Sequence, residues 1–166
     1  MLLKKFFAVF VAVLLSSVIF TACEKQNYSP VLTTVFESDA VVKTGDFSFN
    51  CKICRKKDAS VSVTVKSTEA NGMIMQCVKN DFIVKSNDIS ETMDINNINK
   101  NNSCIALYNA FMYIEGAENL NAKKVDGGYK YYGKTDLGPF VIFQNSNQKL
   151  VSIIFETANL EINFLQ

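Results

Sequence analysis

Much of this chain alternates apolar and polar residues. Apolar side chains take every second position from Phe47 to Ile53, and the same pattern returns from Val61 to Val65. A period of two is typical of strands with one buried face, so these segments predict an antiparallel hairpin. The polar run Arg55-Lys56-Lys57-Asp58 between them predicts the turn.

The later chain repeats this alternation between short turn signals. Further strands are predicted over residues 73–78, 82–85, 89–95, 122–125, 129–134, 139–144, 149–156 and 160–164. Two stretches, Phe140–Phe143 and Ile153–Phe155, are apolar at successive positions, which indicates strands buried on both faces in the middle of a sheet. A single sheet of about ten strands must curl, because its twist accumulates.

Two segments show helical spacing instead. Residues Pro30–Ser38 predict a short amphipathic helix, with Ser29 as its cap and Pro30 in its first turn. A second helix is predicted from Cys104, capped by Ser103, to a stop at Gly116. Its apolar face is rich in aromatic residues, so we expect it to lie on the sheet.

These elements predict an α+β protein with a large curled antiparallel sheet and one or two helices packed in its concave side. No internal repeat or linker divides residues 30–166, so they are expected to form one domain.

The amino-terminal segment has a different character. Lys4 and Lys5 precede an almost wholly apolar run, Phe6–Phe20, which is followed by Thr21, Ala22 and Cys23. A charged start, an apolar core and small residues are the features of an export signal. The apolar run is shorter than the roughly 20 residues that span a bilayer as a helix.

The end of this segment, Phe20-Thr21-Ala22-Cys23, resembles the processing site of bacterial lipoproteins. The resemblance implies a signal peptide over residues 1–22, acylation of Cys23 and a lipidated linker over residues 23–29. The protein would then be lipid-anchored on the extracytoplasmic face of the cell membrane. Phe20 departs from the aliphatic residue usual in that family. Simple cleavage after Ala22 and an uncleaved anchor are the alternatives.

Composition narrows the function classes. Removing the first 22 of the 166 residues removes two of 17 basic and none of 16 acidic residues, which leaves a net charge of −1. Such a chain offers no electrostatic case for binding nucleic acid or a charged membrane surface. Histidine is absent, which excludes Ser-His and Cys-His hydrolase chemistry and removes the commonest metal ligand.

The cysteines offer one motif. Cys51 and Cys54 match C-x-x-C, but on a strand they point to opposite faces and should not bond to each other. The spacing of Cys77 and Cys104 does not suggest a zinc site. Either Cys51, Cys77 and Cys104 are free thiols in the core, or Cys51 bridges to one of the other two.

Three late segments carry a second resemblance. Gly128–Gly133, Gly138–Ile142 and Leu150–Phe155 are similar in pattern to the lipoprotein-sorting carrier and receptor family (Lol type), in which a tyrosine-containing strand leads through a hairpin into a two-faced apolar strand. The resemblance implies an open half-barrel, helices plugging its mouth and an apolar hollow for acyl chains. The sequence shows no match for the arginine that Gram-negative carriers place inside the cavity.

We therefore expect a non-enzymatic lipoprotein that binds a lipid or other hydrophobic ligand, without cofactor or metal. The residues expected to line its cavity are Phe49, Val63, Met75, Phe111 and Phe155. One alternative is a structural or interaction module of the cell envelope with a filled core. The other is a thiol redox enzyme that uses Cys51 and Cys54.

Overall fold

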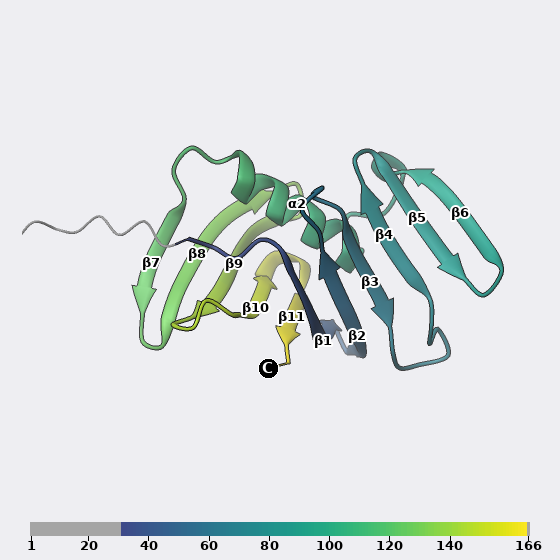
Figure 1. The fold of residues 1–166 in the computed structure, drawn as a ribbon, viewed down its shortest axis with the longest axis horizontal. Coiled ribbons are helices and arrows are strands. Elements are labelled where there is room, and N and C mark those ends of the chain that lie inside the picture. The colour runs from purple at the N-terminus through teal and green to yellow at the C-terminus, as the bar shows by residue number, and fades with distance from the viewer. Residues whose placement is uncertain (1–30, 166) are drawn as a thin grey trace, which may run out of the picture.

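The structure is a computed structural model, and it describes residues 31–165 as one antiparallel sheet and one α-helix (Figure 1). The strands before the helix are β1 (Phe36–Thr44), β2 (Phe47–Arg55), β3 (Val61–Val65), β4 (Ile74–Val78), β5 (Asp81–Ser86) and β6 (Ile89–Asp94). The strands after it are β7 (Asn121–Val125), β8 (Gly128–Thr135), β9 (Gly138–Asn145), β10 (Leu150–Phe155) and β11 (Leu160–Phe164). Helix α2 spans Ser103–Gly116, and the 3₁₀ helices η1 and η2 span Ile95–Asn97 and Glu156–Ala158.

The sheet consists of two meanders joined at its centre. The strand order is β6-β5-β4-β3-β2-β1-β11-β10-β9-β8-β7. Strand β1 pairs with β2 on one side and with β11 on the other, where Ala40 lies opposite Phe164 and Thr44 lies opposite Leu160. The first and last described strands therefore lie side by side, and the sheet edges are β6 and β7.

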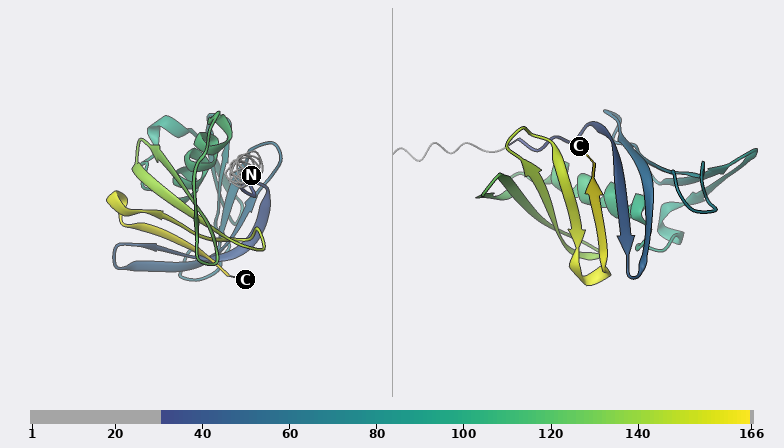
Figure 2. Two further views of the ribbon diagram at one scale, coloured as in Figure 1. Left: turned by 90° about the vertical axis from the view of Figure 1, so that its left-hand side faces the viewer. Right: turned by 90° about the horizontal axis from the view of Figure 1, so that it is seen from below.

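The sheet curls around α2, as the end view in Figure 2 shows. The helix crosses the concave side and packs against β3 and β4 near its start and β8 near its end (Figure 1). Its buried residues are Ser103, Cys104, Ile105, Ala106, Leu107, Ala110, Phe111 and Ile114. These occupy more than a single stripe, because a curled sheet contacts a helix on several sides. The single sheet with a helix in its concave side is confirmed.

Asn102 caps the helix, which begins at Ser103, one residue earlier than predicted. Its side-chain oxygen accepts hydrogen bonds from the backbone N–H groups of Cys104 and Ile105, at 2.9 and 3.3 Å. These are two of the donors that have no partner inside a helix. Ser103, the predicted cap, lies inside the first turn and is buried.

The predicted helix over Pro30–Ser38 is wrong over the part that the structure describes. Residues 31–35 form no helix, and Phe36 begins strand β1. Within this segment Leu32 is buried, but Val31 and Val35 are 71% and 46% exposed. The two valines and the threonines beside them are β-branched residues, which lose side-chain freedom in a helix. Because β1 was missed, the sheet has eleven strands and not about ten.

The two-faced apolar strands are also only partly as predicted. Phe140, Ile142 and Ile153 are buried on the concave side of inner strands. Phe143 and Ile154 point to the convex side, where they are half-buried. No second layer of described residues covers that face, so neighbouring side chains give its apolar positions only partial cover.

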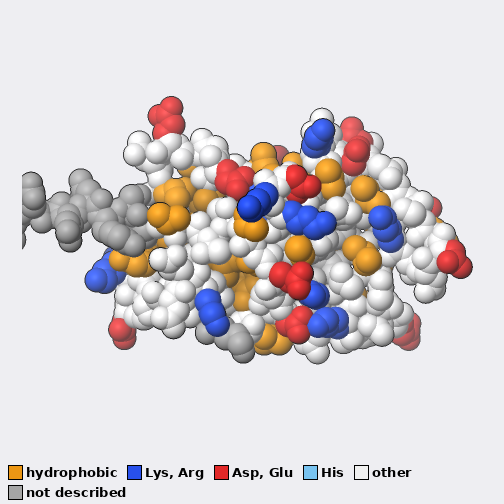
Figure 3. All heavy atoms as spheres, in the orientation of Figure 1, with side chains coloured by type: hydrophobic (Ala, Val, Ile, Leu, Met, Phe, Trp, Pro, Cys, Tyr) orange, Lys and Arg blue, Asp and Glu red, His pale blue; other side chains and the backbone are white. Residues whose placement is uncertain are grey.

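Charged side chains of both signs are interspersed over the face shown in Figure 3. Two ion pairs join oppositely charged side chains on and beside the first strands, Lys52 with Glu37 and Lys66 with Asp39, each at 2.6 Å. All four side chains are well exposed, so such pairs contribute little to stability.

Gly133 on β8 is required where the helix meets the sheet. It lies opposite Phe140, whose ring packs edge-on against Tyr113 of α2 at 5.7 Å between ring centroids. A Cβ atom at position 133 would overlap the Phe140 ring and lie 2.8 Å from Cδ1 of Tyr113. We expect Gly133→Ala to lower the free energy of unfolding by about 1–3 kcal/mol, as overpacking does. Urea unfolding followed by circular dichroism measures this change.

Gly116→Ala is the control, since a Cβ atom there meets nothing within 4 Å. Its unfolding midpoint should stay close to that of the unchanged protein. Equal midpoints for the two variants would show that the contact between α2 and β8 is looser than described.

Candidate ligand-binding site

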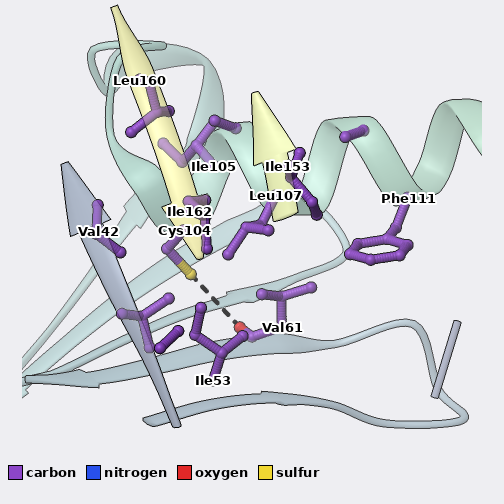
Figure 4. Packing of buried hydrophobic residues seen from close by; sticks show 14 of the residues in the cluster. Val42, Ile53, Val61, Cys104, Ile105, Leu107, Phe111, Ile153, Leu160 and Ile162 are labelled. Carbon is purple, nitrogen blue, oxygen red and sulfur yellow. Dashed lines mark hydrogen bonds between the residues drawn. The ribbon is translucent and has the colours of Figure 1, made fainter. Parts of the chain in front are cut away.

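An apolar hollow of about 230 Å³ lies at the end of the sheet where α2 begins. Its walls come from β1 to β4 and β11, from the turn between β3 and β4, and from the residues at the start of the helix. The lining residues are Val42, Thr44, Phe47, Phe49, Val65, Thr68, Ala70, Met73, Met75, Asn101, Asn102, Ser103 and Leu160. Figure 4 shows two of them, Val42 and Leu160, beside the first turn of the helix.

The hollow has a flexible apolar wall and a polar rim. Phe47 is 54% exposed, and its ring lies 6.0 Å from the ring of Phe49 between centroids. Met73 and Met75 supply unbranched side chains that adapt to the shape of a ligand. On the rim, the Asn102 amide lies 3.4 Å from the sulfur of Met75 while its oxygen caps the helix. Such a site suits an apolar group that enters from solvent.

The predicted cavity residues separate into two groups. Phe49 and Met75 line this hollow. Val63, Phe111 and Phe155 each have no exposed surface and pack within the core beneath and beside the helix. Cys23, the predicted acylation site, lies outside the described residues.

A buried arginine that the sequence pattern did not predict lies inside the concave face. Arg55 was assigned to a polar turn, but it is the last residue of β2 and only 1% exposed. Its Nη2 lies 2.7 Å from Oε2 of Glu115, its Nη1 donates to the carbonyl oxygen of Thr34 at 2.8 Å, and its guanidinium lies 5.0 Å from the centre of the Phe111 ring. The guanidinium therefore joins β2, the end of α2 and the segment before β1.

The segment before β1 crosses the mouth of the concave side. Gln144 on β9, only 2% exposed, accepts from the backbone N–H of Thr33 at 2.8 Å and donates to the carbonyl oxygen of Val31 at 3.0 Å. Together with Arg55, this amide satisfies backbone groups of an irregular segment that would otherwise be costly to bury. The chain itself therefore crosses this end of the concave side, where a larger and more polar hollow of about 860 Å³ lies beside Val31, Tyr129 and Gln144. The smaller apolar hollow lies at the other end.

The cysteines occupy different environments. Cys51 is 1% exposed and Cys54 is half-buried on the other face, as the alternation predicted. Desolvation by burial raises the pKa of Cys51 to about 12, with a smaller contribution from the Asp39 carboxylate. A thiol with so high a pKa supplies little thiolate for redox exchange.

The predicted alternative of a bridge from Cys51 to Cys77 or Cys104 is not formed. All four described cysteines are free thiols. The structure brings Cys77 and Cys104 together instead, with their sulfur atoms 3.5 Å apart. No sequence spacing pointed to this pair, because one lies on a strand and the other on the helix.

Residues 31–165 contain no cluster of three or more His, Cys, Asp or Glu side chains that would hold a metal ion. In the same range no helix has both the length and the apolar character that a membrane crossing needs.

Comparisons with known proteins are sparse. No family model matches this sequence, and no curated protein sequence matches it. Among solved structures, a crystal structure of a LolA superfamily protein from Nitrosomonas europaea is similar with a TM-score of 0.41 and 11% sequence identity, over 82% of this chain and 71% of the other.

The contact of Arg55 with Glu115 makes a prediction about acid stability. The Arg55 guanidinium, which contacts the carboxylate at 2.7 Å, holds the pKa of Glu115 below its usual value of 4.5. A carboxylate with a lowered pKa in the folded state stabilises the fold above pH 4.5, and this contribution is lost as the pH falls through the lower pKa. Glu115→Gln should therefore unfold at lower urea concentration than the unchanged protein at neutral pH.

The difference between the two proteins should shrink as the pH is lowered below 4.5, because protonation removes the same charge. Glu118→Gln, in an exposed acid just beyond the helix, is the matched control and should show no such difference at any pH. A constant difference for Glu115→Gln across the whole range would contradict the ion pair.

Proposed function

We propose that this protein is a non-enzymatic lipoprotein, anchored to the extracytoplasmic face of the cell membrane through acylated Cys23, that binds an apolar ligand group in the hollow beside α2. The observation that supports ligand binding is the apolar lining of that hollow, with Phe47 exposed at its opening. The proposed membrane anchoring rests on the order of charged, apolar and small residues before Cys23.

The volume of the hollow limits the size of the ligand group that it can hold. At about 230 Å³ it is smaller than the pockets of roughly 300–1,000 Å³ that enclose drug-sized molecules. It suits the end of an acyl chain or one apolar side chain better than a whole lipid. A membrane beside the protein would supply acyl chains at high local concentration.

A second function has its own support, because the middle of the concave side is filled. Leu107, Phe111 and Phe155 have no exposed surface, and residues 31–35 are bound across the concave side by Arg55 and Gln144. A filled core favours an envelope interaction module without a small ligand. The first function requires the hollow to bind an apolar ligand and the second does not, so a measurement of ligand binding distinguishes them.

A variant that fills the hollow tests ligand binding. Ala70 lines the hollow and is half-buried, so Ala70→Phe should occupy the space. Mature protein purified from membranes would be incubated with a photoreactive fatty acid, irradiated and mapped by mass spectrometry. We expect adducts on Phe49, Met73 or Met75 in the unchanged protein and at least a tenfold loss in Ala70→Phe.

Ala117→Phe adds the same volume just beyond α2, away from the hollow, and is the matched control. It should keep the adducts. Adducts that persist in Ala70→Phe, or that lie on the convex face, would favour the interaction module.

The anchor is tested separately at Cys23. Two acyl chains on one residue give stable anchoring, since each buried CH₂ contributes about 0.8 kcal/mol. In detergent phase separation, the unchanged protein should enter the detergent phase and Cys23→Ala should move to the aqueous phase. Cys54→Ala is the control and should behave as the unchanged protein. Retention of Cys23→Ala in the detergent phase would exclude lipid anchoring at this residue.

A further inference from the structure

Cys77 and Cys104 meet between the sheet and the start of the helix. Their sulfur atoms are 3.5 Å apart, and neither side chain has exposed surface. Figure 4 shows the Cys104 side chain directed from the first turn of α2 toward the strands. Its sulfur also lies 3.5 Å from the carbonyl oxygens of Val61 and Met75. A thiol has one proton, so it satisfies only one of these neighbours at a time.

The two sulfur atoms are already at contact distance for a bond. A disulfide needs about 2.05 Å between the sulfur atoms, so this pair has to approach by only about 1.5 Å to form one. The other two described thiols are engaged elsewhere. Cys51 lies 3.6 Å from the carbonyl oxygen of Ala40, and Cys54 points to the opposite face of the sheet.

We infer that Cys77 and Cys104 are the pair that this chain joins in a disulfide when it folds in an oxidising compartment. The inference rests on the proposed function only for the place where oxidation occurs, since exported proteins meet such conditions. The pairing itself follows from the positions of the four described thiols.

The reaction is ordinary thiol–disulfide exchange with an external disulfide, such as oxidised glutathione or an oxidoreductase disulfide. One cysteine thiolate attacks that disulfide and forms a mixed disulfide, which releases one thiol. The second cysteine thiolate then displaces the remaining thiol and closes the bridge. The external disulfide accepts two electrons and becomes two thiols, which carry the two protons.

The timing follows from burial. Desolvation raises the pKa of Cys104 well above its usual value, so the folded protein offers little thiolate at this position. Exchange must therefore occur while the first turn of α2 is still docking on β4. Once the helix has docked, the bridge is shielded from reductants by the same burial.

The disulfide would link the two ends of a segment that has few buried residues. The 26 residues between the two cysteines include β5 and β6, and every residue of β6 except Met93 is exposed. This hairpin projects past the helix in Figure 1. A covalent link at its base restricts the unfolded chain and fixes Met75 and Ser103, which line the hollow.

The deciding experiment uses the full chain with Cys23→Ala, so that its result does not depend on acylation. The reduced, unfolded protein is refolded in detergent with a glutathione redox buffer, trapped with an alkylating agent, digested and analysed by mass spectrometry. We expect the Cys77–Cys104 peptide pair in at least tenfold excess over any other pairing. Reduction should lower the melting temperature by about 10 °C.

Two variants test which cysteines the bridge requires. Cys51→Ala removes an equally buried thiol and should still form the bridge, with the same response to reductant. Cys104→Ala should lose both the linked peptide and the response. Because peptide mapping of the parent protein needs neither variant, poor folding of one does not affect the conclusion. Four alkylated thiols, or a bridge through Cys51, would overturn the inference.

A parallel sample separates this inference from the proposed function. Unchanged protein would be trapped with the same agent directly from intact cells. A bridge in both samples supports the pairing and the oxidising location together. A bridge after refolding but free thiols in cells supports the pairing and contradicts the export to an oxidising compartment.

Discussion

One short helix must cover the apolar face of a very wide sheet, and the architecture follows from that constraint. Helix α2 has 14 residues and is therefore about 21 Å long. It contacts β4 near one end and β8 near the other, and the path along the sheet between them, at about 4.8 Å per strand, is about 34 Å. The ratio of these lengths, about 1.6, is that of a half-circle to its diameter. A flat sheet would leave most of this face in water, so the strands wrap the helix.

The same constraint decides where a ligand could enter. In the middle, Leu107 and Phe111 fill the space completely. At the end of α2, the buried side chains of Arg55 and Gln144 bind residues 31–35 across the concave side, so that polar contacts hold the chain where the helix does not reach. At its start no such segment is present among the described residues, and the strands meet only the first turn and its cap. The apolar hollow lies there, so the proposed binding site exists because the helix does not cover the whole concave face of the sheet.

The sequence pattern predicted the elements in which apolar residues recur at one regular spacing. The alternation in Phe47–Ile53 and Val61–Val65 identified the first hairpin, and Gly116 correctly ended the helix. Strand β1 was missed because apolar positions at its start also fit a helical spacing. Arg55 was assigned to solvent because it stands beside two lysines, and only the fold reveals its carboxylate and carbonyl partners. The meeting of Cys77 with Cys104 depends on where α2 docks, which no local pattern encodes.

The seam between β1 and β11 has a consequence for kinetics. Nearly the whole described chain lies between Ala40 and its partner Phe164, whereas every other strand pair is a local hairpin. Local hairpins close in microseconds, but a pairing across so long a loop waits for a rarer encounter. Each meander should therefore exist for a time as a separate half with one open central edge. Those edges are the places where two unfinished molecules would pair with each other before either had closed its own sheet.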